Sequence, residues 1–256
     1  MISVMAYPSI SMRHGEVVCV AGFRSDTLWQ PDWVRLFPFR VRDVPQHLRV
    51  RKWDVIRLRA RKASTDQRPE SLTPDMDSIR VTGHLDTRHN WEARRALVEP
   101  HRGRTFREVL ARHAAHGASL AVAEAGEILD AEVTPRPTKE LEDARLKAER
   151  EVAQGELFSL EDRQPLEPIP FDFHVVTRYT DDSEPRRLKV IDWEINQAFR
   201  NYRSSYSDPE QRFVTAGSMT FADRRTIQCS WSATCIASPI SGSCSGSCGL
   251  VESDCL

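Results

Sequence analysis

Three strand-like segments lie close together near the start of the chain, and no helical segment separates them. Residues Val17–Phe23 form a short apolar run rich in β-branched side chains, which is typical of a buried strand. Trp33–Phe37 alternates apolar and basic positions and stops at Pro38, and Trp53–Arg61 alternates most clearly. Because no helix intervenes, we expect these strands to form a small antiparallel sheet or a barrel.

Helices and further strands follow a polar, proline-punctuated loop at 63–77. Thr105 and Glu108 have the spacing of a capping box, so a helix is expected to begin there and to stop at Gly117. Asp192 is a natural N-cap for a last helix. The other expected elements are a helix at Asn90–Val98, strands at Ser119–Val122 and Ile128–Val133, a charged helix at Thr138–Leu157, and a hairpin of Phe171–Tyr179 with Arg187–Ile191.

Composition narrows the class of protein. Hydrophobic residues make up 40% of the chain, charged residues 29%, and the formal net charge is −1, so the chain as a whole is not a polyelectrolyte binder. No apolar run approaches the roughly 20 residues that span a bilayer, and the first residues lack the pattern of a signal peptide. The prediction is a cytoplasmic protein with no membrane partner.

A basic stripe is the first candidate for function. Arg57, Arg59 and Arg61 would lie on one face of a strand, about 7 Å apart, close to the phosphate repeat of a nucleic acid. The alternative is a solvated outer face over an aromatic core. The predicted nucleic-acid surface adds stacking rings and further guanidinium groups to the stripe, and its full set is Arg35, Arg57, Arg59, Arg61, Arg68, Trp33 and Trp53.

Acidic side chains supply a second candidate. Asp66, Arg68 and Glu70 could grip a phosphate or a metal, and Asp192 with Glu194 offers two carboxylates near a helix start. A local ion pair and an ordinary N-cap explain the same residues without a ligand. No phosphate-binding glycine loop, dinucleotide fingerprint, nucleophile elbow or zincin helix occurs, so no cofactor is predicted and an enzyme is the weaker hypothesis.

Several segments together resemble a family of uncharacterised bacterial proteins over about residues 3–212. They are Val18-Cys19-Val20-Ala21-Gly22, Trp33-Val34-Arg35-Leu36-Phe37-Pro38, Lys52-Trp53-Asp54-Val55-Ile56, Asp66-Gln67-Arg68-Pro69-Glu70-Ser71 and Asp192-Trp193-Glu194-Ile195. The first two also resemble segments of dual OB-fold proteins from prokaryotic conflict systems. That resemblance implies barrels that handle nucleic acid or nucleotides, and a role in phage defence.

The C-terminal tail departs from that family. Five cysteines crowd into it at a spacing unlike a structural zinc site, and no charged residue occurs between Thr226 and Val251. The family's usual ending resembles Gly-Asn-x-His-Arg-x-Pro followed by an apolar strand and Trp-Pro. GC-rich codons for residues 229–250, read from the third base of the first codon, can encode such an ending. We therefore expect the chain from about Phe213 onward to be a frameshift product.

The sequence thus predicts an α+β protein with an OB-like β domain at 1–80 and a helical and β segment at 81–158. A hairpin-plus-helix lobe at 159–212 and a disordered, aberrant tail at 213–256 complete it. The leading hypothesis is a non-catalytic nucleic-acid or nucleotide-binding accessory protein. The alternatives are a metal-dependent hydrolase or nuclease that uses Asp66, Glu70, Asp192 and Glu194, and an inactive product of a frameshifted gene.

Overall fold

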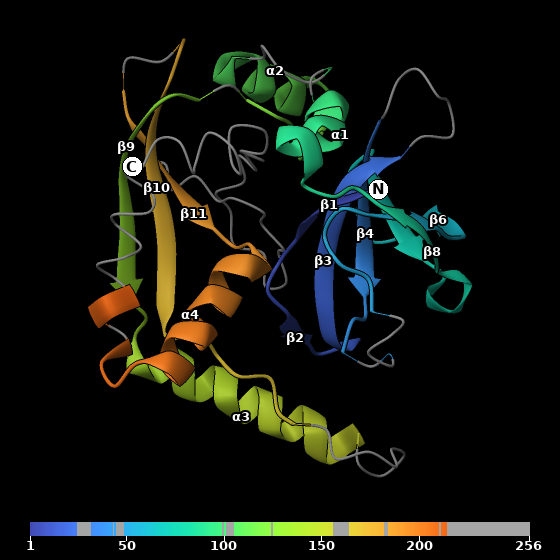
Figure 1. Cartoon of the computed structure of the whole chain (residues 1–256). Coiled ribbons are helices and arrows are strands. Elements are labelled where there is room, and N and C mark those ends of the chain that lie inside the picture. Colours follow the sequence, from blue (N-terminus) through green and yellow to red (C-terminus); the bar gives the residue numbers. More distant parts are fainter. Residues whose placement is uncertain are drawn as a thin grey trace.

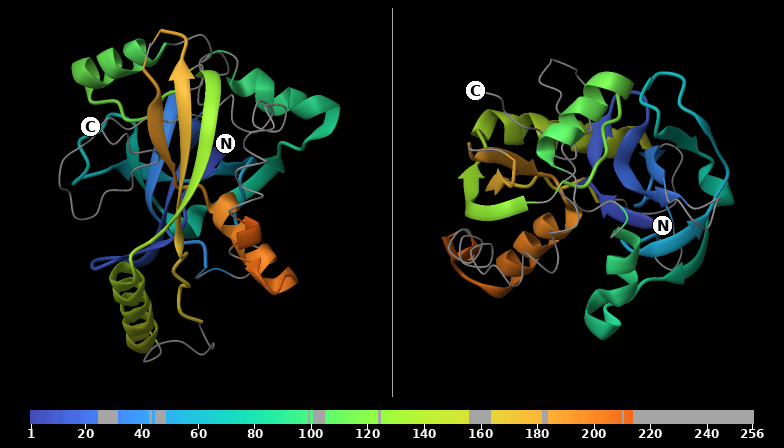
Figure 2. Two further views of the ribbon diagram at one scale, coloured as in Figure 1. Left: turned by 90° about the vertical axis from the view of Figure 1, so that its left-hand side faces the viewer. Right: turned by 90° about the horizontal axis from the view of Figure 1, so that it is seen from above.

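A computed structural model of the chain describes residues 1–24, 32–42, 44, 49–98, 100, 105–123, 125–155, 164–181, 184–209 and 211–213. In these residues the protein is α+β, as the sequence predicts, with three sheets and four α-helices. Figures 1 and 2 show the two larger sheets side by side, one built from the N-terminal strands and one from the later strands. No described helix is both long enough and apolar enough to cross a membrane.

The N-terminal sheet has six strands: β1 (Ile2–Met5), β2 (Ser9–Ser11), β3 (Gly15–Arg24), β4 (Asp32–Phe39), β6 (Ala60–Lys62) and β7 (Ser71–Pro74). Their order is β1-β3-β4-β7-β6, and β2 pairs with β3. Most pairs are antiparallel, but β4 and β7 run parallel. Among the described strands β1 and β6 end the sheet without pairing to each other, so a closed, OB-like barrel is not formed by them.

The predicted single strand at Trp53–Arg61 is divided into two, which corrects the sequence prediction. Its first part, β5 (Asp54–Arg57), pairs with β8 (Arg80–His84) in a separate two-stranded ribbon, whereas β6 pairs with β7. The break lies at Arg59, whose N–H donates to Ser78 Oγ at 2.9 Å and whose carbonyl accepts from the Asp75 N–H at 2.8 Å. With these bonds Arg59 lies outside both strand pairings, and the chain passes from the ribbon of β5 and β8 to the pairing of β6 with β7.

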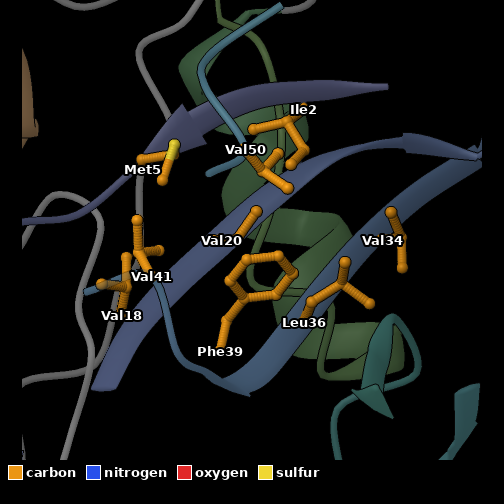
Figure 3. Packing of buried hydrophobic residues seen from close by; sticks show 9 residues of the cluster. All are labelled: Ile2, Met5, Val18, Val20, Val34, Leu36, Phe39, Val41 and Val50. Atoms are coloured by element: carbon orange, nitrogen blue, oxygen red, sulfur yellow. The ribbon is translucent and has the colours of Figure 1, made fainter. Parts of the chain in front are cut away.

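One face of the N-terminal sheet carries an apolar core, drawn in Figure 3. Alternate residues of β3 and β4 point into it, including Val18, Val20 and Leu36, and Phe39 fills its centre with 1% exposure. Ile56 and Leu58 pack against the cluster from the ribbon side. The prediction that Val17–Phe23 is a buried strand is confirmed by β3.

The other face of this sheet is covered by residues 119–123. Leu120 packs with Val4, Cys19 and Ala21 on that face. The sequence predicts a strand at Ser119–Val122, but this segment pairs with no strand and serves instead as a buried cover. Burial on both faces explains why β3 is an almost continuous apolar run.

The remaining elements are α1 (Arg88–Val98), α2 (Phe106–His116), β9 (Ala125–Pro135), α3 (Thr138–Gly155), β10 (Phe171–Tyr179), β11 (Arg186–Val190) and α4 (Trp193–Ser205). The Thr105–Glu108 capping box and the left-handed Gly117 cap bound α2, and Asp192 caps α4, all as predicted. Strands β9, β10 and β11 form one antiparallel sheet. It therefore joins segments that the sequence assigns to separate lobes.

An aromatic cluster holds α4 against this second sheet. Phe171, Phe173 and Phe199 are buried in it, and Phe213 is 5% exposed with its ring 5.3 Å from that of Phe199. The sequence predicts that packing is lost from about Phe213 onward, and Phe213 itself corrects that prediction. The rest of the expected aberrant tail, with its five cysteines, lies outside the described residues.

Backbone bonds tie the two sheets together. The Tyr7 N–H donates to the Ile191 carbonyl at 3.0 Å, Ala6 and Asp192 form a β-bridge, and the Tyr7 hydroxyl donates to the Glu167 carbonyl at 2.7 Å. The chain that leaves β1 thus meets the chain that enters α4.

Candidate nucleic-acid interface

The arginines of the predicted stripe are exposed, but they do not share one strand. Arg57 ends β5, Arg61 lies in β6, and Arg59 stands at the break between them. Arg59 forms two hydrogen bonds to Asp75 Oδ2, at 3.1 and 2.8 Å, while its side chain remains 81% exposed. The prediction that the three arginines lie on one face of a single strand is therefore wrong. Their exposure at the surface is as predicted.

The ribbon adds a residue that the sequence reasoning missed, Arg80. It lies directly opposite Arg57 in the antiparallel pair, and both side chains are exposed. The Arg80 guanidinium donates to the backbone carbonyls of Asp77 and Ile79. Within the described residues no carboxylate contacts either guanidinium. Like charges directly opposite on a ladder repel, so this pair gains from any bound anion.

We call Arg57, Arg59, Arg61, Lys62 and Arg80 the arginine face. They come from β5, β6, β8 and the break between β5 and β6, and in Figure 1 β6 and β8 lie together at one margin of the molecule. Lys62 Nζ donates to the carbonyls of Arg68 and Pro69, at 2.7 Å each, and contacts no carboxylate in the described residues. Asp75 is the acid that contacts this face, through Arg59.

Arg35 does not belong to this face, which corrects the prediction. It is 2% exposed on β4, under the cover of residues 119–123, and its Nη1 donates to Ser119 Oγ at 3.3 Å. Its backbone N–H donates to the Glu70 carbonyl. The alternation that suggested an outward basic position holds, but a segment distant in sequence buries that side of the strand.

Glu70 is a buried acceptor at the junction of the two parts of the chain. Its Oε1 accepts from the Ser119 N–H at 2.8 Å and from Ser119 Oγ at 2.5 Å. In the same loop Asp66 forms a two-point ion pair with Arg68 and accepts from Ser71 Oγ at 2.7 Å. Burial alone would raise the pKa of Asp66, but the hydrogen bonds from Arg68 and Ser71 outweigh it and lower that pKa to about 2.

The second pair of acids is held by Lys52. Its Nζ lies 2.9 Å from Asp192 Oδ2 and 2.8 Å from Glu194 Oε2, and Asp192 also accepts from the Glu194 N–H as the cap of α4. Burial favours the neutral amine, but the two carboxylates outweigh it and raise the pKa of Lys52. Lys52 therefore fastens the base of the ribbon to α4.

The metal site of the alternative hypothesis is not assembled. Glu70 and Asp66 bond to Ser119 and Arg68, whereas Asp192 and Glu194 share Lys52, so the acids occupy two separate clusters. Among the described residues no group of three or more His, Cys, Asp or Glu side chains is placed to hold a metal ion. The described geometry therefore does not bring the four predicted acids together in one cluster.

The two predicted stacking rings have different surroundings. Trp33 packs against Phe23, with ring centroids 4.3 Å apart, as part of the interior. Trp53 stands at the base of the ribbon with the Arg94 guanidinium carbon 4.7 Å above its ring centroid. Arg94 is the other residue that the sequence reasoning missed, because the contact joins α1 to a residue far along the chain.

Comparison with known proteins finds two similar families, and neither has a known function. No curated protein and no solved structure gives a significant match. The second of two family models continues to residue 227, beyond the point near Phe213 where the sequence predicts the aberrant tail to begin. Residues 1–100 are similar to the domain of unknown function DUF8758, and residues 102–227 are similar to the domain of unknown function DUF8757.

Proposed function

We propose that the N-terminal part of the chain binds nucleic acid through the arginine face, and that the protein acts as a non-catalytic accessory. The observation that carries the proposal is the Arg57–Arg80 pair, two exposed guanidinium groups opposite each other with no described carboxylate in contact. A phosphate between them would replace repulsion by two charge-assisted hydrogen bonds. Each phosphate neutralised also releases condensed counterions, which favours binding at low salt.

The proposal extends to an OB-like role for the N-terminal strands and to a place in a phage-defence system. Support for the first comes from short, mostly antiparallel strands with an apolar core on one face of the sheet, a setting in which OB folds present nucleic-acid surfaces. Support for the second comes only from the resemblance of the Val18–Gly22 and Trp33–Pro38 segments to proteins of conflict systems. A nucleic-acid partner is common to both.

The test is the affinity for a labelled 20-nucleotide single strand and for the matching duplex, measured by fluorescence anisotropy at low salt. Replacement of Arg57→Gln and Arg80→Gln together is expected to weaken binding of both by at least about tenfold. The matched control is Arg112→Gln with Arg150→Gln, which removes the same charge from exposed positions of α2 and α3. Equal effects of the two double variants, or no binding by the parent protein, would contradict the proposal.

A further inference from the structure

Arg94 and Trp53 form a fixed stack at the base of the ribbon. The Arg94 Nε donates to the Leu85 carbonyl at 2.7 Å, and the guanidinium carbon lies 4.7 Å from the centroid of the Trp53 ring. Trp53 is itself fixed on both sides, because its N–H donates to the Ile2 carbonyl at 2.6 Å and its carbonyl accepts from the Leu85 N–H at 2.9 Å. The backbone of Trp53 and the guanidinium of Arg94 are therefore both tied to neighbouring backbone groups.

The backbone of Trp53 is strained. Its φ is +69°, in the left-handed region that a bulky residue seldom occupies. Such a conformation costs about 1–3 kcal/mol, persists only where the surroundings impose it, and is concentrated at ligand sites. At Trp53 this strain coincides with the contact between the indole ring and the Arg94 guanidinium.

The polar edge of Arg94 is available to a ligand. Among the described residues the side-chain hydrogen bond of Arg94 is made by Nε, and no acceptor contacts its two terminal nitrogens. Glu194 and Asp86 attract Arg94 electrostatically from a distance. Glu194 forms its ion pair with Lys52, and Asp86 forms its ion pair with Arg88. A flat, weakly hydrated cation with two terminal amino groups at its edge, which carry four N–H donors, suits a nucleobase or its phosphate.

We propose that the Arg94–Trp53 stack is a platform for an unpaired base, so that the preferred ligand is a single strand. The inference depends on the proposed nucleic-acid function and specifies its substrate class. Trp53 precedes β5, and Arg57 ends it, which places the stack and the arginine pair about 13 Å apart along the ribbon. In this proposal one strand that covers this distance stacks a base at Arg94 and places phosphates on Arg57 and Arg80.

A duplex would use this site differently. Its bases are stacked on one another, so it can offer phosphates to the arginine face but no free base to Arg94. The substitution Arg94→Lys keeps the charge and removes the planar group. If Arg94→Lys weakens binding of the single strand but not of the duplex, the lost interaction is base stacking. If Arg94 only connects α1 to the ribbon, the substitution weakens binding of both ligands.

The experiment compares oligo-dT of 20 nucleotides with a 20-base-pair duplex, using anisotropy with the full chain. Arg94→Lys is expected to weaken oligo-dT binding at least about fivefold and duplex binding less than twofold. The control Arg95→Lys, at the adjacent exposed position of α1, is expected to change neither. Thermal unfolding of each variant shows whether the fold is retained, and Trp53→Leu provides a second removal of the platform.

Equal loss on both ligands, or no loss on oligo-dT for either platform variant, overturns this inference and leaves the arginine face in place. A parent protein that binds neither ligand, or binding indifferent to Arg57→Gln with Arg80→Gln, overturns the proposed function and the inference with it.

Discussion

Two groups of charged side chains come from neighbouring stretches of the same chain and have opposite surroundings. At the junction between the N-terminal sheet and the later segments, Glu70 and Lys52 each contact a partner more than forty positions away in sequence. On the arginine face, Arg57 and Arg80 face each other with no described acid in contact. The first arrangement pairs its charges within the fold, whereas the second has no carboxylate partner among the described residues. The type of charged residue does not distinguish the two groups. What distinguishes them is whether an oppositely charged or hydrogen-bonding side chain lies in contact among the described residues.

The largest effect on stability is expected at Glu70. In Glu70→Ala the buried N–H and hydroxyl of Ser119 lose their acceptor, so the free energy of unfolding should fall by about 3 kcal/mol. Glu70→Gln retains an acceptor oxygen and should lose much less. Urea denaturation of both variants measures the difference. A loss below about 0.5 kcal/mol in Glu70→Ala would mean that the junction does not depend on this contact.

The next effect is expected at Lys52. Lys52→Met leaves Asp192 buried without its cation, and the expected loss is about 2 kcal/mol, with little from the exposed Glu194. Because the folded-state pKa of Lys52 is raised above 10.5, this stabilisation is present below about pH 10.5 while the carboxylates are ionised, and it disappears as the pH rises through the folded-state value of Lys52. Burial raises the pKa of Asp192, so protonation of Asp192 also removes the ion pair in acid. A gap between parent and variant that persists unchanged well above that range would contradict the ion pair.

Asp66 tests at acidic pH whether an ion pair within the fold stabilises the protein. Its pKa of about 2 lies below its ordinary 3.8, so its pairing stabilises the protein above about pH 3.8 and is lost as the pH falls toward 2. With allowance for partial exposure, Asp66→Asn should cost about 1 kcal/mol at pH 7. Denaturation curves of the parent and variant should converge near pH 2. Curves that stay equally far apart would show that the carboxylate charge is not involved.

The smallest effect on stability is expected at the arginine face. Its sign is opposite to that expected for the paired charges of Glu70, Lys52 and Asp66. Arg80→Gln relieves the repulsion from Arg57, so stability should stay the same or rise by about 0.3–0.5 kcal/mol. Arg112→Gln, on the exposed surface of α2, provides the reference. A loss above about 1 kcal/mol would place Arg80 with the structural group instead.

Local patterns in the sequence predict much of the second half of the described chain. The capping box at Thr105, the N-cap at Asp192 and the β10–β11 hairpin all depend on residues close in sequence. The N-terminal half is harder, because β4 pairs in parallel with β7 and β5 pairs with β8 across intervening strands. No local periodicity encodes those partners.

The candidate site shows the same limit. The sequence predicts exposed side chains for Arg57, Arg59 and Arg61, but it does not predict the break in the strand that places them in different elements. The burial of Arg35 depends on the cover at 119–123. Arg80 opposes Arg57, and Arg94 meets Trp53, only through long-range pairing. The frameshifted tail remains a prediction, and resequencing the gene across the codons for residues 227–250 tests it.

The salt dependence of binding tests the central claim most directly. The logarithm of the dissociation constant for oligo-dT is measured against the logarithm of salt concentration for the parent and for Arg57→Gln with Arg80→Gln. If both arginines contact phosphates, the slope should decrease in magnitude by about 1.4, since each contact to a single strand contributes about 0.7. An unchanged slope in the double variant would contradict the assignment of the arginine face as a nucleic-acid interface.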